Sequence, residues 1–451
     1  MLTQKLASFV INTREADVPA DVLDRARDAL VDTLGCAMAG TLDEGAEIAQ
    51  RWVLETGARA QSTVVGTKLS TSPAEAAFVN GLAAHALDFD DSLTTLRGHP
   101  TAPMLGAGLA VGEATGASGK ALLAAIAIGL EVGGKLGPAL GAGHYMKGWH
   151  STATVGAFTA TAVAARLWRL SVEQLQTAFG IAASEASGLI ANFGTMTKPF
   201  HAGHAAKSGV LAAWMARRGF TADAGIFDDG SDFFATYGAG DGVPLAQALA
   251  TLATPWEMEK PGIYVKRWPC CYCNHRPVGG MLKLIAEHGI RADEVEAVEI
   301  GFLPGSDTAL VSSDPHTGLE GKFSIEYVAA ATLYDGKLTL ETFTDPMVQR
   351  APLRALMKKV KRYRIPDSKT YSGVVGYSDV AIKTTRGEFK LRIDHAPGSP
   401  EWPMTNEDRD EKFLDCAGRV LGAPGASKLL GMLRGFATLA DMKALMAATV
   451  P

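Results

Sequence analysis

Apolar residues recur at three- and four-residue spacing through most of the first 250 positions, which is the pattern of helices with one buried face. The segments that show it most clearly are 21–39, 72–87, 101–114, 120–135, 151–168, 171–189 and 202–218. Ser171 to Gln174 forms a Ser-x-x-Gln capping box at the start of one of them. Many positions are Ala or Gly, which lets helix axes approach closely. The pattern predicts a tightly packed helical domain.

The pattern changes near position 264. Apolar and polar residues then alternate, as in half-buried strands, in segments 295–302, 376–384 and 388–394. Helical patterns lie between these segments, at 278–288, 325–334 and 352–360. We therefore expect an α+β region with a small antiparallel sheet.

Helical spacing returns after position 403, in segments 407–421, 426–435 and 439–448. The sequence thus predicts a mainly α protein, in which a large all-helical domain is built from both ends of the chain. Residues 1–264 and 404–451 form this domain, and a smaller α+β domain, residues 265–403, is inserted between them. A length of 451 residues also favours two hydrophobic cores over one.

Composition and charge favour a small-molecule partner. The formal net charge is -5 and the chain has no dense Lys/Arg block, so we expect no nucleic-acid partner and no anionic membrane surface. The longest apolar stretch, 121–132, contains Glu131 and is shorter than the ~20 residues that cross a bilayer, so it predicts a buried helix. The first 30 residues are charged throughout and contain no signal-peptide core, which favours a cytoplasmic location.

The cysteines and the missing cofactor motifs narrow the class further. Five cysteines, three of them at 270, 271 and 273, make a poor disulfide framework and fit a reducing compartment. The sequence has no Gly-x-Gly-x-x-Gly after a strand, no Walker-type loop, no Gly-x-Ser-x-Gly elbow and no His-Glu-x-x-His. Nucleotide cofactors and serine hydrolysis are therefore unsupported.

The first candidate motif is an acidic turn. Asp88, Asp90 and Asp91 lie within four residues, and His99-Pro100 follows at the start of a helix. Crowded carboxylates repel one another unless one binds a partner or stays protonated, so their pKa values should move apart. A solvated helix end with a capping turn explains the same residues equally well.

The second motif is the segment from His144 to Thr152. His150 stands where a helix should begin, so its imidazole would lie near free backbone N–H groups that attract anions. A loop histidine bonded to a neighbouring carbonyl is the alternative.

The third motif is the segment from Gly194 to His204. Lys198 precedes Pro199, so we expect an extended backbone at Lys198 and a helix that begins near the proline. An embedded ammonium beside helix N-termini would have a lowered pKa and become a usable base. An ordinary surface charge is the alternative.

The fourth motif is the segment from Tyr264 to Arg276. Cys270, Cys273 and His275 could suggest zinc, but no second Cys/His pair completes a four-ligand site, so no metal is predicted. Lys266, Arg267 and Arg276 instead offer positive charges for substrate carboxylates.

Taken together and in this order, the motifs resemble the MmgE/PrpD family. The matching segments are Asp88-Phe89-Asp90-Asp91 with His99-Pro100, Gly148-Trp149-His150, Thr197-Lys198-Pro199-Phe200-His201, Lys266-Arg267-Trp268-Pro269-Cys270 with His275, and Phe323-Ser324-Ile325-Glu326-Tyr327-Val328. The resemblance implies a helical domain with an inserted α+β domain, usually a homodimer, and an active site at the domain boundary. It also implies that no metal or organic cofactor is needed.

The resemblance implies roles for individual residues. The candidate catalytic residues are Lys198, His150, Tyr145, Asp88 and His99. The candidate substrate-binding residues are Lys266, Arg267, Tyr327, His201, Asp91 and His275. Lys198 or His150 would remove a proton next to a carboxylate of a small di- or tricarboxylate, and fixed cations would stabilise the carbanion-like transition state.

Four functions stay open at this stage. A dehydratase like those that act on 2-methylcitrate comes first, and an iminodisuccinate-type epimerase, with Tyr145 and Lys198 as its two bases, stands close to it. A cis-aconitate decarboxylase comes third, because the resemblance implies a histidine in decarboxylases at the position of Cys271. A non-catalytic anion-binding protein is the fourth.

Overall fold

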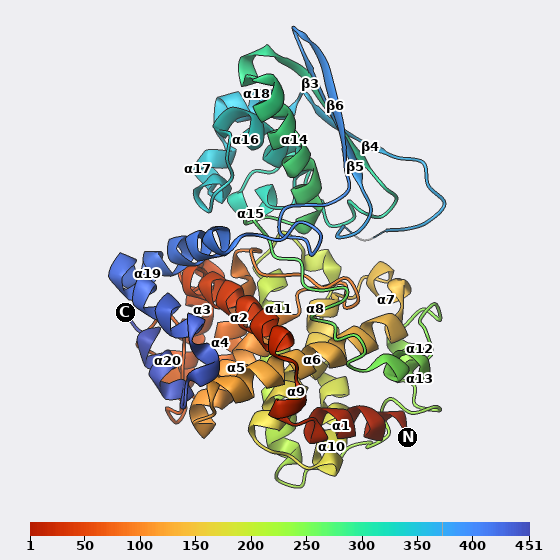
Figure 1. Ribbon diagram of the computed structural model, residues 1–451, viewed down its shortest axis with the longest axis vertical. Helices are drawn as coiled ribbons and strands as arrows, with labels where there is room; N and C mark the ends of the chain where they lie inside the picture. Colours follow the sequence, from red (N-terminus) through yellow and green to blue (C-terminus); the bar gives the residue numbers. More distant parts are fainter. Residues whose placement is uncertain (372) are drawn as a thin grey trace. The chain divides into compact units, whose positions relative to one another are not determined.

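Helices dominate the computed structural model of the chain, which describes residues 1–371 and 373–451 (Figure 1). About 57% of the structure is helical and its sheets are small, which confirms the mainly α class. The chain divides into two compact units. The first contains Met1–Ala191, Met196–Ile263 and Asn406–Pro451, and the second contains Asn192–Thr195 and Tyr264–Thr405. That residues 1–264 and 404–451 form one domain, with residues 265–403 as an inserted domain, stays a prediction.

The first unit is helical apart from a two-stranded ribbon of β1 (Ser62–Thr63) and β2 (Ser70–Thr71). Its longer helices are α1 (Leu2–Asn12), α2 (Ala20–Gly40), α3 (Glu44–Thr56), α4 (Pro73–Ala86), α5 (Thr101–Thr115), α6 (Gly119–Leu140), α9 (Gly156–Leu167), α10 (Val172–Glu185), α11 (Thr197–Ala216) and α19 (Asn406–Arg434). Its shorter helices are α7 (Ala142–Met146), α8 (Ser151–Thr154), α12 (Phe233–Tyr237), α13 (Leu245–Ala248) and α20 (Met442–Ala448). The capping box at Ser171 forms as predicted.

Small residues set the spacing of the central helices. A Cβ atom on Gly106 of α5 would lie 2.6 Å from the carbonyl oxygen of Ala77 in α4, and one on Gly203 of α11 would lie 2.4 Å from that of Phe78. The backbones of α4, α5 and α11 therefore touch where a larger residue would hold them apart. Helix α6 is long and apolar enough to cross a membrane, but 89% of its most apolar window is buried inside the protein, as expected for a core helix.

Two of the differences from the predicted helices concern the polar motifs. Segment 151–168 forms two helices, α8 and α9, rather than one. Helix α11 begins at Thr197, so the backbone of Lys198 is helical and the predicted extended conformation is wrong. Pro199 is tolerated there because the first turn of a helix needs no intrahelical N–H donors, and the packing of α11 overrides the preference of a residue that precedes proline.

The second unit contains a four-stranded sheet in the order β4-β3-β5-β6. Its strands are β3 (Val295–Phe302), β4 (Val360–Arg364), β5 (Ser378–Thr384) and β6 (Gly387–Ile393). Its helices are α14 (His275–His288), α15 (Gly318–Gly321), α16 (Ile325–Asp335), α17 (Asp345–Val348) and α18 (Ala351–Met357). Strands β3, β5 and β6 pair antiparallel, as predicted, but β4 pairs parallel to β3, so the sheet is mixed rather than antiparallel throughout. Only the first residue of this edge strand is buried, so its sequence lacks the usual alternation.

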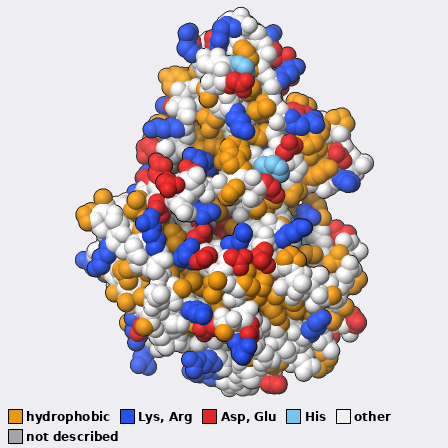
Figure 2. Space-filling view, viewed as in Figure 1, with side chains coloured by type: hydrophobic (Ala, Val, Ile, Leu, Met, Phe, Trp, Pro, Cys, Tyr) orange, Lys and Arg blue, Asp and Glu red, His pale blue; other side chains and the backbone are white. Residues whose placement is uncertain are grey.

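Charged side chains of both signs are interspersed over the face drawn in Figure 2, rather than gathered into one basic field. This distribution is in keeping with the formal net charge of -5.

Two helical glycines provide a matched test of the close packing. A Cβ atom on Gly40 of α2 would lie 2.0 Å from the carbonyl oxygen of Ala83, whereas one on Gly418 of α19 would meet nothing within 4 Å. We expect Gly40→Ala to lower the free energy of unfolding by about 1–3 kcal/mol. Gly418→Ala should raise it by about 0.5–1 kcal/mol, because alanine loses less backbone entropy in a helix. Urea unfolding would measure both, and equal effects would contradict this account.

Candidate active site

A buried hydrogen-bonded chain of three side chains lies in the first unit. His85, in the last turn of α4, has Nδ1 2.8 Å from Oδ1 of Asp90. Its Nε2 lies 3.0 Å from Nζ of Lys198 in α11. Because an ionised carboxylate only accepts hydrogen bonds, Nδ1 of His85 donates to Asp90, and the Nε2 lone pair accepts from the Lys198 ammonium.

Asp88 forms the second contact of Lys198. Its Oδ1 atom lies 2.5 Å from Lys198 Nζ, and both side chains are 5% exposed or less. Asp88 has φ = 50°, in the left-handed region that non-glycine residues rarely adopt. This conformation costs about 1 kcal/mol and is held by the surrounding structure. The backbone geometry therefore helps to hold the carboxylate against the ammonium.

The acidic turn is anchored from the C-terminal part of the chain. Lys412 of α19 donates from Nζ to the carbonyl oxygen of Phe89, at 2.8 Å. The same ammonium lies 2.7 Å from Asp32 of α2. The turn between Asp88 and Asp91 is thus tied to both α2 and α19, which restrains its carboxylates.

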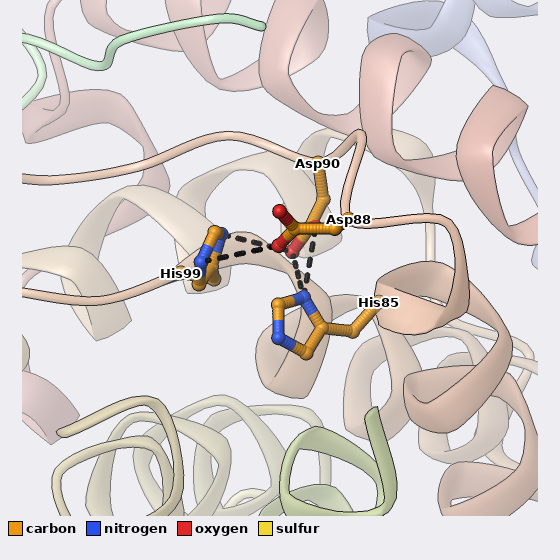
Figure 3. A group of neighbouring side chains, drawn as sticks. All are labelled: His85, Asp88, Asp90 and His99. Carbon is orange, nitrogen blue, oxygen red and sulfur yellow. Dashed lines mark hydrogen bonds and ion pairs between the residues drawn. The ribbon is translucent and has the colours of Figure 1, made fainter. Parts of the chain in front are cut away.

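His99 closes the cluster from the other side (Figure 3). Its Nδ1 lies 2.8 Å from the carbonyl oxygen of Asp91 and 3.5 Å from Oδ2 of Asp90, and its Nε2 lies 3.8 Å from Oδ1 of Asp88. The His99 and His85 rings are 4.3 Å apart between centroids. The backbone N–H of His99 donates to Thr152 Oγ1 at 3.0 Å, which fixes the loop on α8.

His150 and His201 form a buried imidazole pair beside this cluster. Their Nδ1 atoms are 3.0 Å apart, so one donates and the other accepts. Burial, together with the positive charge of Lys198, lowers the pKa of His150 well below its usual value. Burial and Lys198 also lower the pKa of His201 to about 4. Both rings are therefore neutral at pH 7, in the form that accepts a proton.

Asp91 has a different role from the carboxylates next to it. Its Oδ2 atom lies 2.5 Å from Thr101 Oγ1, and its Oδ1 atom lies 3.3 Å from the backbone N of Thr101, the first residue of α5. Burial and the charge of Asp90 raise the pKa of Asp91 to about 8, although the bonds from Thr101 oppose the shift. The carboxyl is mostly protonated at pH 7, and it caps α5 rather than adding charge to the cluster.

His85, Asp88, Asp90 and His99 could together offer ligand atoms to a metal ion. These atoms lie within 4.8 Å of one another. The Lys198 ammonium already contacts two of the four residues and supplies the positive charge of the cluster. A divalent cation would have to displace it, so the donor set fits an ion-paired acid–base network better than a metal centre. The absence of a metal requirement stays a prediction.

The other predicted residues belong to other elements of the chain. Tyr145 is half-buried in α7, near enough to Arg97 for its charge to affect the pKa of that guanidinium. Lys266, His275 and Tyr327 belong to the second unit and are fully buried there, whereas Arg267 is exposed.

Within the second unit, several of these groups make structural contacts. Tyr327 Oη donates to the carbonyl oxygen of Thr342 at 2.5 Å. The His275 ring stacks on Tyr272, with the centroids 4.8 Å apart. Arg276, considered from sequence as a carboxylate binder, donates to the backbone carbonyls of residues 373, 374 and 375. Its guanidinium therefore fixes a loop.

Sequence reasoning gave no role to His85 and Asp90, although they link the network together. His85 is the one polar side chain in the run Leu82-Ala83-Ala84-His85-Ala86, and a titratable residue on a wholly buried helical face is a signal that could have identified it.

The first unit of this mainly α protein thus holds a buried lysine–carboxylate–imidazole network. The chain belongs to the MmgE/PrpD family: residues 4–246 match the model of its N-terminal domain and residues 268–432 match that of its C-terminal domain. It is similar to the human cis-aconitate decarboxylase, at 28% identity over 98% of this chain and 93% of that protein. The mouse cis-aconitate decarboxylase is 28% identical over 98% and 92%, and that of Aspergillus terreus is 25% identical over 99% and 95%. The chain is thus an enzyme of the lyase or isomerase type.

The state of Asp91 predicts how stability depends on pH. Its folded-state pKa of about 8 lies above the ordinary value, so between about pH 4 and 8 the folded protein holds a proton that the unfolded chain releases. This group therefore makes stability fall as pH rises through that range. Asp91→Asn keeps one acceptor oxygen for Thr101 and removes the titration. Relative to the parent, the variant should gain up to about 1.4 kcal/mol per pH unit between pH 5.5 and 8 in urea unfolding. A difference that is constant with pH would contradict the assignment.

Proposed function

We propose that this enzyme moves a proton at the carbon next to a carboxylate of a small di- or tricarboxylate. The observation that supports the proposal is the position of Lys198, whose ammonium lies 2.5 Å from Asp88 and 3.0 Å from His85. A buried lysine held by a carboxylate and an imidazole is fixed in direction and has a partner that can accept its proton.

The His85–Asp90 pair explains how Lys198 could act as a base. Transfer of one proton from the ammonium to His85 Nε2 leaves a neutral amine and an imidazolium, and Asp90 stabilises the imidazolium through Nδ1. The amine then takes the proton from the α-carbon of the substrate. In the reverse direction, the ammonium returns a proton to carbon or donates one to a leaving hydroxide. All protons remain accounted for within the three side chains and the substrate.

The neutral His150–His201 pair is a second place for a proton. His150 Nδ1 lies 3.0 Å from His201 Nδ1, and its ring centroid is 6.0 Å from that of His85. Because the low pKa of His150 keeps the ring uncharged, it can accept a hydrogen bond without adding positive charge beside Lys198, and it carries a proton only as a transient imidazolium. Two proton-handling groups allow removal at one atom and donation at another, as elimination requires.

Dehydration of a 2-methylcitrate-like hydroxyacid is our first assignment. Decarboxylation of a cis-aconitate-like substrate is the second, because the relatives bear that name. Loss of carbon dioxide also produces a carbanion that must be protonated, so the same lysine suits it. Cys271 stands where the sequence resemblance implies a histidine in decarboxylases, which favours dehydration. Epimerisation with Tyr145 and Lys198 as opposed bases is the third alternative. The tricarboxylate partner, the homodimer and the cytoplasmic location stay predictions.

Proton NMR in deuterium oxide separates these reactions. The purified enzyme would be incubated with 2-methylcitrate, cis-aconitate and iminodisuccinate in turn. A dehydratase replaces the methyl signal of 2-methylcitrate by that of a methyl group on a double bond, or gives an alkene proton if the CH2 carbon loses the proton. A decarboxylase gives a product that lacks one carboxylate, and an epimerase exchanges the α-proton without loss of mass. Citrate-like diacids and triacids that stabilise the fold against heat but show no turnover or exchange would favour a non-catalytic anion-binding protein and contradict the proposal.

Lysine substitutions on α11 test the assignment of the base. Lys198→Ala should lower kcat by about 10²-fold or more, because it removes the group that transfers the proton. Lys207→Ala is the matched control, since Lys207 lies on the same helix and pairs with Glu75 at 2.7 Å on its partly exposed face. That variant should stay within about twofold of the parent. Similar losses in both variants, or near-normal turnover in Lys198→Ala, would contradict the role of Lys198.

Asp90 tests the proton-accepting role of His85. Asp90→Asn keeps the size of the side chain but removes the charge that stabilises the His85 imidazolium. We expect kcat to fall about 10²- to 10⁴-fold with little change in KM, because His85 then lacks the charge that stabilises its imidazolium. Steady-state kinetics would measure this, with the melting temperature as a check on folding. A rise in KM at unchanged kcat, or a melting temperature that falls together with kcat, would indicate a merely structural role for Asp90.

A further inference from the structure

The first unit contains a polar cavity that is separate from the network just described. It has a volume of about 990 Å³, and residues at the C-terminal ends of α5, α9 and α11 contribute to its wall. Its charged lining residues are Arg59, Arg166, Arg169, Arg217, Arg218 and Glu15. Neither Lys198 nor any histidine of the acid–base network lines it. The cavity is therefore a separate candidate site.

The positive charge of this cavity is largely uncompensated. In the part of the chain that the structure describes, none of its five arginines lies within 4.0 Å of a carboxylate in an ion pair, and Glu15 is the one acidic side chain in the lining. The whole chain has a formal net charge of -5. A cavity with surplus positive charge concentrates the electric field of its charged groups and therefore attracts anions, even on a protein whose net charge is negative.

The backbone of Arg169 adopts a left-handed conformation that glycine usually occupies. Helix α9 ends in a Schellman motif, with bonds from Leu170 N to Ala165 O and from Arg169 N to Arg166 O. The residue in the left-handed position of this motif is usually glycine, but here it is Arg169, at φ = 55°. Helix α11 ends in the same motif and has Gly219, at φ = 86°, in that position. An arginine in a position that glycine fits better is a local cost, which leads us to look for a use of its side chain.

Helix electrostatics explains only part of the cluster. Arg166 lies in the last turn of α9 and Arg217 caps α11, where cations interact favourably with the helix dipole. Arg59 belongs to neither helix, and the guanidinium carbon of Arg218 lies 3.8 Å from the ring centroid of Trp214. This stacking holds the guanidinium group of Arg218 beside the cavity and leaves the N–H groups at its edge available for an anion.

We propose that this cavity binds a polyphosphate group, as carried by a nucleoside triphosphate. Planar guanidinium groups match phosphate oxygens bidentately, and several of them together favour a ligand with three or four negative charges. The volume is larger than a small carboxylate needs and lies in the range of nucleotide-sized pockets. Trp168 and Trp214 in the lining offer aromatic surface for a base.

Isothermal titration calorimetry on the whole protein tests this proposal without any reference to turnover. The probes are ATP, inorganic tripolyphosphate, adenosine and citrate. We expect saturable binding of ATP and tripolyphosphate, no binding of adenosine and at least about tenfold weaker binding of citrate. Tighter binding of ATP than of tripolyphosphate assigns a nucleotide, and equal affinities assign the inorganic group. Failure of both phosphates to bind, or equal binding of citrate, would overturn the proposal.

Variants locate the binding. Arg217→Gln should weaken polyphosphate binding about tenfold. Arg25→Gln, at an exposed arginine of α2 outside the cavity, should leave it unchanged. Arg169→Gly should weaken binding while the melting temperature stays equal or rises, because glycine suits the left-handed position. Equal effects of Arg217→Gln and Arg25→Gln, or an Arg169→Gly variant that melts lower and binds normally, would show that these arginines serve the fold alone.

Discussion

The arrangement of the candidate active site depends on the buried ion pair between Lys198 and Asp88. Two charges out of water are tolerated only when each is held against a partner, and loss of one partner from a buried pair costs about 3–5 kcal/mol. The pair joins α11 to the turn that follows α4. The same two helices touch at Gly203 and Phe78, where a Cβ atom would lie 2.4 Å from a backbone oxygen. Close packing of the helices and pairing of the charges thus require the same geometry.

Three carboxylates within four residues reach three different states. Asp88 is paired with Lys198, and Asp90 accepts from His85. Asp91 is mostly protonated because it is buried beside Asp90. The repulsion that makes such a turn unfavourable is removed by one ammonium, one imidazole and one proton. The turn can therefore lie inside the protein, where an attached proton or charge has a strong effect on reactivity.

Much of the fold and part of the site could be predicted from the sequence. Helical spacing located α2, α4 and α5 to within one or two residues, although α4 and α5 are buried on all faces along most of their length. The edge strand β4 was not predicted, because an exposed strand shows no alternation of apolar and polar residues. Lys198, His99 and His150 were identified through the family resemblance of their motifs, because the local pattern alone left an ordinary structural role open for each.

The rest of the site depends on contacts between distant segments. His85 and Lys198 are 113 positions apart, and no spacing rule relates them. Arg276 looked like a ligand for substrate, yet the carbonyl groups of a loop about 100 residues away take its hydrogen bonds. A charge in a sequence does not reveal whether the fold provides it with a partner, and that partner decides between a binding and a structural role.

The two sites of the first unit differ in their exposure to solvent. The Lys198 network is buried, so its charges must nearly balance, and its electrostatics are little affected by dissolved salt. Arg59, Arg169, Arg217 and Arg218 are exposed, so water allows them a surplus of positive charge that a buried site could not hold. Because the Debye length falls from about 10 Å at 0.1 M salt to about 3 Å at 1 M, the attraction of the arginine cavity for anions should weaken over that range. The proton transfers of the buried network should be far less sensitive. Ionic strength therefore distinguishes the chemistry of one site from the binding of the other without any change in the sequence.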